Sequence, residues 1–255
     1  MSFIELLSWA VWDLMRPRKV VTLIICGLMG PLFGGLAKFA SGSSETAYGL
    51  AVPLAVYSFT LIILSVVFAA GIVSSEMVGK TISYLLTRPI PRYKILLAKW
   101  LGATLVVALS TMISATLTAF VIYGADIGRS PIVSDLWLIP VGAVAYCSIF
   151  TLMSVLSTKP WLFAVAFGFL WEAFVPFLPG DLKSLSVMAQ LRALGSDTSF
   201  ASVPSGMAEM LSMLNQNELS ASSAWNTLAI LVFFSLIAAC VIFTVAEFVP
   251  KDEAG

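Results

Sequence analysis

The sequence predicts an all-α membrane protein with six transmembrane helices. Of its 255 residues, 59% are hydrophobic and 11% are charged, whereas a soluble domain has about 25% charged residues. The mean hydropathy is +0.98. Six apolar runs approach or exceed the roughly 20 residues that a helix needs to cross a bilayer. Lipid is therefore the expected solvent for most of the chain, which we treat as a single transmembrane domain over residues 1–255.

The composition also excludes several kinds of chemistry. Histidine is absent, which removes the commonest metal ligand and the commonest general base. Cys26, Cys147 and Cys240 lie within apolar runs and lack C-x-x-C spacing, so we interpret them as buried hydrophobic residues. The net charge of zero provides no basic surface for nucleic acid. We therefore assign no catalytic residue, no metal site and no nucleic-acid partner.

Residues 1–18 are predicted to form an amphipathic interfacial helix whose partner is membrane lipid. Its apolar face is Phe3, Leu6, Leu7, Ala10, Val11 and Leu14, at helical spacing. Trp9 and Trp12 prefer the membrane interface, and Pro17 marks the bend into the first span. Glu5 and Asp13 stand where a signal peptide would be basic, so no cleavage is expected. The alternative is that these residues begin a longer first span.

The six expected spans follow in order and differ in length. They cover residues 20–39, 50–73, 95–123, 136–157, 161–178 and 225–249. The third is long enough to tilt in the bilayer or to project beyond it. The fifth is short and has Pro176 and Pro179 at its end, which predicts a kink or an end before the far surface.

The basic residues predict that both termini are cytoplasmic and that the chain lies in the inner (cytoplasmic) membrane of the cell. Cytoplasmic loops of membrane proteins are enriched in Lys and Arg. With the N-terminus inside, ten of the 14 basic residues fall on the cytoplasmic side. They are Arg16, Arg18, Lys19, Lys80, Arg88, Arg92, Lys94, Lys99, Lys159 and Lys251. The outer side then holds Lys38, Arg129, Lys183 and Arg192.

The expected outer connections are two short loops and one long segment. Residues 40–49 and 124–135 form the short polar loops. Residues 179–224 form an extracytoplasmic segment that is too apolar to be disordered. Its apolar spacing predicts short helices near 185–194 and 207–214. The sequence leaves open whether this segment binds an extracytoplasmic partner.

Residues 74–94 are expected to form a cytoplasmic connection, and part of it resembles a nucleotide-binding motif. Gly79, Lys80 and Thr81 resemble the end of a phosphate-binding loop. Ser74 stands where that loop requires glycine, and a membrane helix precedes it instead of a strand. We therefore expect no nucleotide to bind this chain here.

A short cytoplasmic helix is expected in the same connection. Ile82, Leu85 and Leu86 share one apolar face, and Pro89 ends the helix. Such a helix between two spans suits the docking of a soluble partner. The alternative is an ordinary basic loop that anchors the topology.

The same segment contains a motif that resembles the pattern of a known family. It consists of Glu76, Gly79, Thr81, Leu85, Leu86, Pro89 and Arg92, followed by Lys99 and Gly102. This resembles the E-x-x-x-G-T-x-x-x-L-L-x-x-P-x-x-R pattern of the permease subunits of type-2 ABC exporters, although Lys80 separates Gly79 from Thr81. The six spans, the interfacial helix and the long outer segment before the last span are similar in layout to permeases encoded apart from their ATPase, including those that serve nitrous-oxide-reductase maturation.

The resemblance implies a membrane-spanning subunit of an ATP-driven exporter. Two copies of this chain would form a homodimeric translocation path, driven by two copies of a separate ABC ATP-binding subunit. Residues 76–92 would form the coupling helix and the cytoplasmic gate. ATP and Mg²⁺ would bind the partner, with no cofactor in this chain. The substrate, the direction of transport and the identity of the ATPase do not follow from the sequence.

Two other classes of function compete with transport. A membrane scaffold or assembly factor would share the same physical features, and only the coupling-like segment favours transport over it. An intramembrane enzyme is disfavoured because the sequence has no histidine, no paired intramembrane acids and no Gly-x-Ser-x-Gly motif.

Three residues within the expected spans are candidates for the translocation path or an interface. Gly30 and Gly34 form a Gly-x-x-x-Gly step that permits close helix approach, within the subunit or across a dimer. Pro31 between them suggests a kink as the alternative. Glu172 is an acid inside a span, where a lipid-facing charge costs about 3 kcal/mol. It should therefore face a helix interface, the path or the outer headgroups.

Overall fold

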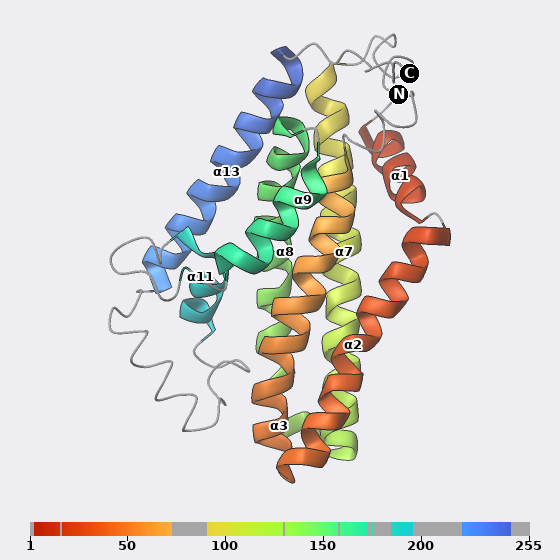
Figure 1. Cartoon of the computed structure of the whole chain (residues 1–255), viewed down its shortest axis with the longest axis vertical. Helices are drawn as coiled ribbons and strands as arrows, with labels where there is room; N and C mark the ends of the chain where they lie inside the picture. The colour runs from red at the N-terminus through yellow and green to blue at the C-terminus, as the bar shows by residue number, and fades with distance from the viewer. Residues whose placement is uncertain are drawn as a thin grey trace.

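The computed structural model describes residues 3–15, 17–72, 91–129, 131–157, 159–172, 175, 185–195 and 221–245. These residues form helices and short connections without any strand, which confirms the all-α prediction. In chain order the main helices are α1 (Phe3–Leu14), α2 (Pro17–Ser41), α3 (Ser44–Ala51), α7 (Arg92–Tyr123), α8 (Ile132–Leu156), α9 (Pro160–Val165), α11 (Val187–Leu194) and α13 (Ala221–Val245). Figure 1 shows them as a bundle of long helices with shorter ones at its sides.

Three of the helices continue into segments with wider or tighter turns. The helix α3 runs on through η1 (Val52–Leu61), α4 (Ile62–Ser65) and η2 (Val66–Ala70). The helix α7 is followed by η3 (Gly124–Arg129), and α9 by η4 (Ala166–Trp171). In η1, the Thr60 hydroxyl lies 2.9 Å from the carbonyl of Ala55, five residues earlier, and 3.1 Å from the carbonyl of Cys26 in α2, so its single proton is shared between these two acceptors. The wide turns of η1 thus go together with a polar contact to the neighbouring helix.

Five helices among the described residues are long and apolar enough to cross a membrane, so the multi-pass prediction is confirmed. They cover Lys19–Ser41, Ser44–Ala70, Tyr93–Gly128, Ile132–Leu156 and Ser222–Val245. The span expected over residues 161–178 is a shorter apolar helix, Pro160–Trp171. At 1.5 Å per residue, it covers about 18 Å of the roughly 30 Å hydrocarbon core. It is therefore too short to count as a span over the residues that the structure describes.

The two short outer loops are more helical than expected. Between α2 and α3 only residues 42 and 43 lie outside helices, because α2 continues to Ser41 and α3 starts at Ser44. Gly42 makes the turn possible with a φ of 69°, a conformation that glycine adopts without strain. In the expected loop over 124–135, η3 forms a short helix and α8 already begins at Ile132. Asp135 therefore lies in the first turn of α8 rather than in a loop.

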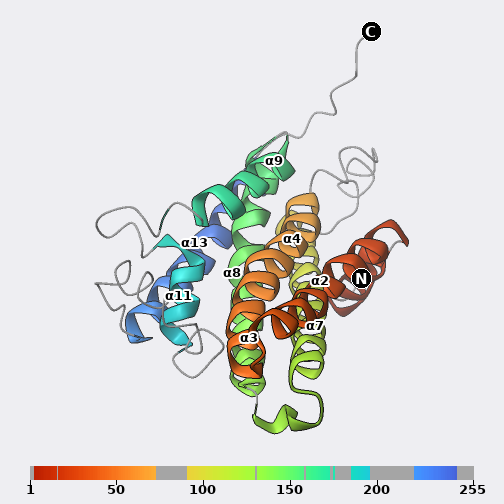
Figure 2. The ribbon, with the colours of Figure 1, turned by 60° about the horizontal axis from the view of Figure 1, so that its bottom comes forward.

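The centre of the bundle is α8 together with the continuous helix from α3 to η2. Both are mostly buried, whereas only a small share of α2 and of α13 is buried. The exposed side chains on α13 are large and apolar, and include Ile230, Phe233, Phe234, Ile237 and Val241. A helix that is apolar on its outer face is stable when lipid is its solvent. The peripheral position of α2 and α13 is visible in Figures 1 and 2.

The two ends of the bundle carry different elements. One end carries α1, the beginning of α7 and the end of α13, and the other carries α3 (Figure 1). Viewed from the second direction, η3 also lies at the α3 end (Figure 2). We call these the α1 end and the α3 end. Their assignment to the cytoplasmic and outer sides stays a prediction from the basic residues.

The first helix is present, and its apolar face packs mainly against α7. Leu6, Ala10 and Leu14 are buried, and a Cβ added to Gly102 of α7 would lie 3.4 Å from the Cβ of Ala10. Trp12 is 80% exposed, as suits an indole at a membrane interface. The helix ends at Leu14, and Pro17 is the first residue of α2, where its missing N–H costs nothing. The expected helix over residues 1–18 is therefore split at this point.

Candidate functional site

The motif residues of the expected coupling segment are largely outside the described part of the chain. This applies to Glu76, Gly79, Thr81, Leu85, Leu86 and Pro89. Arg92 is the first residue of α7. The structure does describe both points where the segment joins the bundle, namely Ile72 just after η2 and Pro91 just before α7.

Both attachment points belong to the α1 end of the bundle. Ile72 lines a small pocket together with Ala10 of α1 and Lys99 of α7. Lys99 is 8% exposed, and its Nζ lies 5.1 Å from the centre of the Trp9 ring. A lysine amine over an indole at this distance is a cation–π contact. The first helix is thus held beside the two ends of the segment that carries the motif.

Glu172 lies at a helix interface, one of the positions expected for it. Its carboxylate accepts hydrogen bonds from the start of α11, with Oε2 at 2.5 Å from Ser186 Oγ and Oε1 at 3.1 Å from the Val187 nitrogen. A third bond comes from the Met188 nitrogen at 3.4 Å. Ser186 is the N-cap of α11 and accepts a bond from Ala189 at 3.1 Å. Free N–H groups at a helix start are natural partners for a carboxylate.

Two further polar side chains belong to the Glu172 group. Electrostatic interaction links the carboxylate with Arg192, which lies in the last turn of α11, and with Tyr146 of α8. Tyr146 is fully buried, and Gln190 of α11 is 1% exposed. The group therefore brings together α8, α11 and the residue that follows η4 in apolar surroundings, and its hydrogen bonds join Glu172 to the start of α11. We call Glu172, Ser186, Arg192 and Tyr146 the Glu172 cluster.

A second buried carboxylate lies at the α3 end. Asp135 of α8 is completely buried, and its Oδ2 accepts a hydrogen bond from the Tyr48 hydroxyl at 2.8 Å. Its Oδ1 accepts one from the Tyr57 hydroxyl at 3.0 Å. Tyr48 lies in α3 and Tyr57 in η1. We call these three residues the Asp135 cluster; it fastens α8 to the central helix beside it.

Gly30 and Gly34 make their close approach within the subunit. A Cβ added to Gly30 would lie 2.6 Å from Ser114 Oγ and from Thr118 Oγ1, both on α7. A Cβ on Gly34 would lie 2.8 Å from the Thr118 methyl. Ser114 also donates a hydrogen bond to the Gly27 carbonyl at 2.8 Å. Of the two alternatives for these glycines, the structure shows the contact with α7, and α2 continues as a helix through Pro31.

Sequence reasoning did not single out the Asp135 cluster or the partners of Glu172. Asp135 marks the boundary of an apolar run in the sequence, which hides its burial. Its two tyrosines are 87 and 78 residues away in the chain. Ser186 at the start of an apolar run is a recognisable N-cap signal. The short helix predicted near 185–194 is α11 (Val187–Leu194), whereas its contact with Glu172 was not predicted.

Five apolar helices of spanning length, together with buried polar clusters between them, define a multi-pass membrane protein of the α-helical class. The chain belongs to the family described as "Protein of unknown function (DUF2705)", whose model matches residues 23–176. The matched region extends from α2 past η4 and includes Asp135 and Glu172. No curated protein matches the chain.

Proposed function

We propose that this chain is the membrane-spanning permease subunit of an ATP-driven ABC transporter, acting as an exporter. Two copies would form the translocation path, and two copies of a separate ATP-binding subunit would supply the energy. The motif from Glu76 to Arg92 and its resemblance to type-2 ABC exporters motivate the proposal. The arrangement of spanning helices is compatible with it.

One observation carries the proposal furthest: the residues of η2 that lead into the motif segment and the helix α7 that follows it both lie beside α1. Ile72 and Lys99 share a pocket with Ala10 and Asp13 of α1. A docked ATPase that moved residues 74–94 would therefore act on η2 and α7 together. These two elements belong to two of the spanning helices, so the force would reach the membrane directly.

The Glu172 cluster is also compatible with the proposed transport function. Glu172 is half-buried rather than sealed, and it joins α11 to α8 and η4. Under the proposal, α11 belongs to the extracytoplasmic segment and the carboxylate holds it against the spanning helices. The carboxylate would then act as a positioning group for the outer part of the path.

The test is co-purification of the tagged full-length chain from cells that express its chromosomal neighbours. In mild detergent we expect a stoichiometric partner with a phosphate-binding loop, at two copies for two copies of this chain by native mass spectrometry. Glu76→Ala and Arg92→Ala should keep membrane insertion but lose the partner or its stimulated ATP hydrolysis. Lys159→Ala, an exposed lysine in the turn before α9, is the matched control and should keep both.

Two results would reject the proposal. A preparation without any ATPase partner would favour a scaffold or assembly factor instead. A partner whose binding and ATP hydrolysis are unchanged in both motif variants would show that residues 76–92 are not a coupling helix.

A further inference from the structure

In the described part of the chain, two apolar helices contain π-helical segments, in which the turns are wider than in an α-helix. The segments η1 and η2 belong to the helix that starts at α3, and η4 completes the short helix that starts at α9. The helices α2 and α8 stay α-helical although they contain Pro31 and Pro140, so an internal proline does not by itself account for the wide turns. Wide turns inside α-helices are rare and occur frequently at functional sites.

Side-chain hydroxyls mark the wide turns of η1 independently of its backbone. In α7, the hydroxyls of Thr104 and Thr111 each donate to the carbonyl four residues earlier at 2.8 Å, which is the usual contact for threonine inside an α-helix. In η1, the hydroxyls of Ser58 and Thr60 each lie 2.9 Å from the carbonyl five residues earlier. These two hydroxyls thus support a register that differs by one residue from that of an α-helix.

The two helices with wide turns pack directly against each other. A Cβ added to Gly168 of η4 would lie 2.5 Å from Cγ2 of Ile62, so the side chain of any other residue would push the helices apart. Ile62 begins α4, the single α-helical turn between η1 and η2. Beside it, the ring centroids of Phe59 in η1 and Phe169 in η4 are 5.7 Å apart. We call these four residues the Gly168 crossing.

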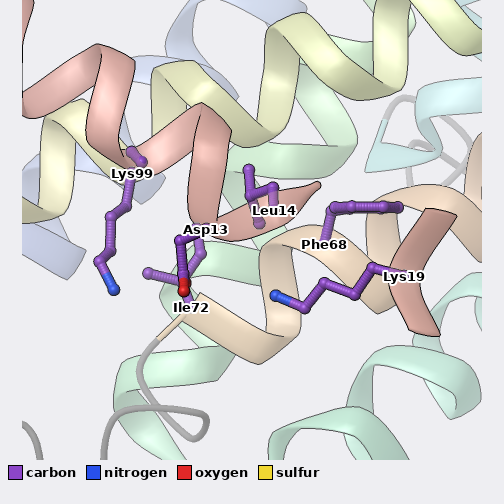
Figure 3. A pocket seen from close by; sticks show the side chains of 7 residues that line it. Asp13, Leu14, Lys19, Phe68, Ile72 and Lys99 are labelled. Carbon is purple, nitrogen blue, oxygen red and sulfur yellow. The ribbon is translucent and has the colours of Figure 1, made fainter. Parts of the chain in front are cut away.

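Each helix of the crossing leads into a different part of the molecule. The residues Phe68 and Ile72 at the end of the first helix lie beside Leu14 of α1 and Lys99 of α7 (Figure 3), and the motif segment follows Ile72. The second helix is followed by Glu172, which accepts hydrogen bonds from the start of α11. The crossing therefore lies between the attachment of the motif segment and the attachment of α11.

We propose that the Gly168 crossing is a two-state coupling device, in which η1 changes between π-helical and α-helical turns. The two states differ by one residue of register, which corresponds to about 100° of rotation and about 1.5 Å of rise along the helix. The rotation would move Ile62 against Gly168, so it would reach Ile72 along one helix and Glu172 along the other. A register change is a discrete alternative in a packed interior, as coupling between distant sites requires. This inference does not depend on the proposed transport function.

The first test removes a hydroxyl that supports the wide turns. Thr60→Val keeps the shape of the side chain but deletes the donor, which favours α-helical turns. The register change should displace Glu172 from the start of α11. In the purified full-length chain in lipid nanodiscs, amide hydrogen exchange at Val187 and Met188 should therefore become about three- to fivefold faster, as for the loss of one hydrogen bond.

Two matched variants control for this test. Thr60→Ser keeps the hydroxyl and should exchange like the unaltered chain. Thr116→Val removes an exposed hydroxyl of α7 that bonds to the carbonyl four residues earlier, and it should leave α11 unchanged. Protection of α8 should be the same in all of these variants, which separates a register change from a general loss of stability.

The second test acts on the crossing itself. Gly168→Ala places a methyl group against Ile62 and should speed exchange at both ends of the device, in α11 and in the peptide that ends at Ile72. The steric conflict requires Cγ2 of Ile62. In the Ile62→Ala background, Gly168→Ala should therefore cause no further increase in exchange at either end.

Three results would overturn the proposal. The first is unchanged exchange at Val187 and Met188 in the Thr60→Val variant. The second is an equal increase throughout α8 in that variant, because the loss of stability would then be general. The third is a response of α11 alone to Gly168→Ala, because the crossing would then hold η4 in place without coupling it to the end of η2.

Discussion

Two carboxylates in the described part of the chain, those of Asp135 and Glu172, accept hydrogen bonds from different kinds of donor. Asp135 is completely enclosed, and its described hydrogen bonds come from the hydroxyl groups of two tyrosines on another spanning helix. Glu172 is half-buried, and it accepts hydrogen bonds from two backbone N–H groups at the start of α11 and from the Ser186 hydroxyl. One cluster joins side chains within the spanning bundle, whereas the other holds the beginning of a short helix.

The difference shows which part of the molecule each acid stabilises. The Asp135 cluster lies between two of the most buried helices, so its loss should affect the whole bundle. The Glu172 cluster anchors α11, an element of eight residues, and its loss should act locally. A membrane interior leaves few other partners for a polar group, so each cluster is needed where it occurs.

The largest effect is expected for Asp135→Ala. It leaves the hydroxyls of Tyr48 and Tyr57 buried without this acceptor, and each lost bond of this kind costs about 1 to 1.5 kcal/mol. The free energy of unfolding should therefore fall by about 2 to 3 kcal/mol. Unfolding by sodium dodecyl sulfate in bicelles, followed by tryptophan fluorescence, measures this change.

The control for that experiment is Asp126→Ala, which removes an exposed acid of the nearby η3 helix. It should leave the unfolding curve unchanged. Equal stability of the Asp135 variant and the Asp126 variant would show that the Asp135 cluster is not a fastening point.

A smaller and local effect is expected for Glu172→Gln. The amide keeps one oxygen acceptor, but its NH₂ group faces donors at the start of α11, so about 1 to 2 kcal/mol of local stability should be lost. Amide hydrogen exchange at Val187 and Met188 should become roughly tenfold faster. Protection of α8 should stay the same, and a parallel loss in α8 would contradict the local role of this cluster.

The smallest effect is expected for Tyr48→Phe. Asp135 keeps its bond to Tyr57, and no large cavity forms, so the free energy of unfolding should fall by about 0.6 kcal/mol. A double-mutant cycle with Tyr57→Phe measures whether the two hydroxyls share the carboxylate. We expect the double variant to lose more than the sum of the single variants, because only then is the acid left without both donors. Strict additivity would mean that the tyrosines act independently.

The helices themselves were largely predictable from the sequence. The runs over 20–39, 95–123 and 225–249 coincide with spans in α2, α7 and α13, because a long apolar run has no stable alternative to a helix in lipid. Helix boundaries were less predictable. Polar residues near Asp135 indicated a loop. However, a polar residue occurs both in loops and in the first turn of a helix, so it does not fix the helix boundary. The 161–178 run was predicted as a span from composition, whereas its described residues form the shorter apolar helix Pro160–Trp171.

The candidate sites also differ in whether the sequence predicts them. The motif from Glu76 to Arg92 can be recognised from the sequence alone, because its residues lie close together in the chain. The Glu172 cluster cannot be recognised in this way, because it needs the start of α11 to pack against Glu172. Basic residues near a span predict only which side of the membrane they occupy.

The sequence by itself thus determined the solvent of this protein, its helical class and most of its spans, since these depend on apolar composition over local windows. Only the tertiary structure decided that Gly30 faces α7, that Asp135 is closed in by Tyr48 and Tyr57, and that Glu172 anchors α11. These contacts join residues that are far apart in the chain or on different elements. The stability that these contacts contribute depends on which helix faces pack against each other, and no local pattern of residues specifies that pairing.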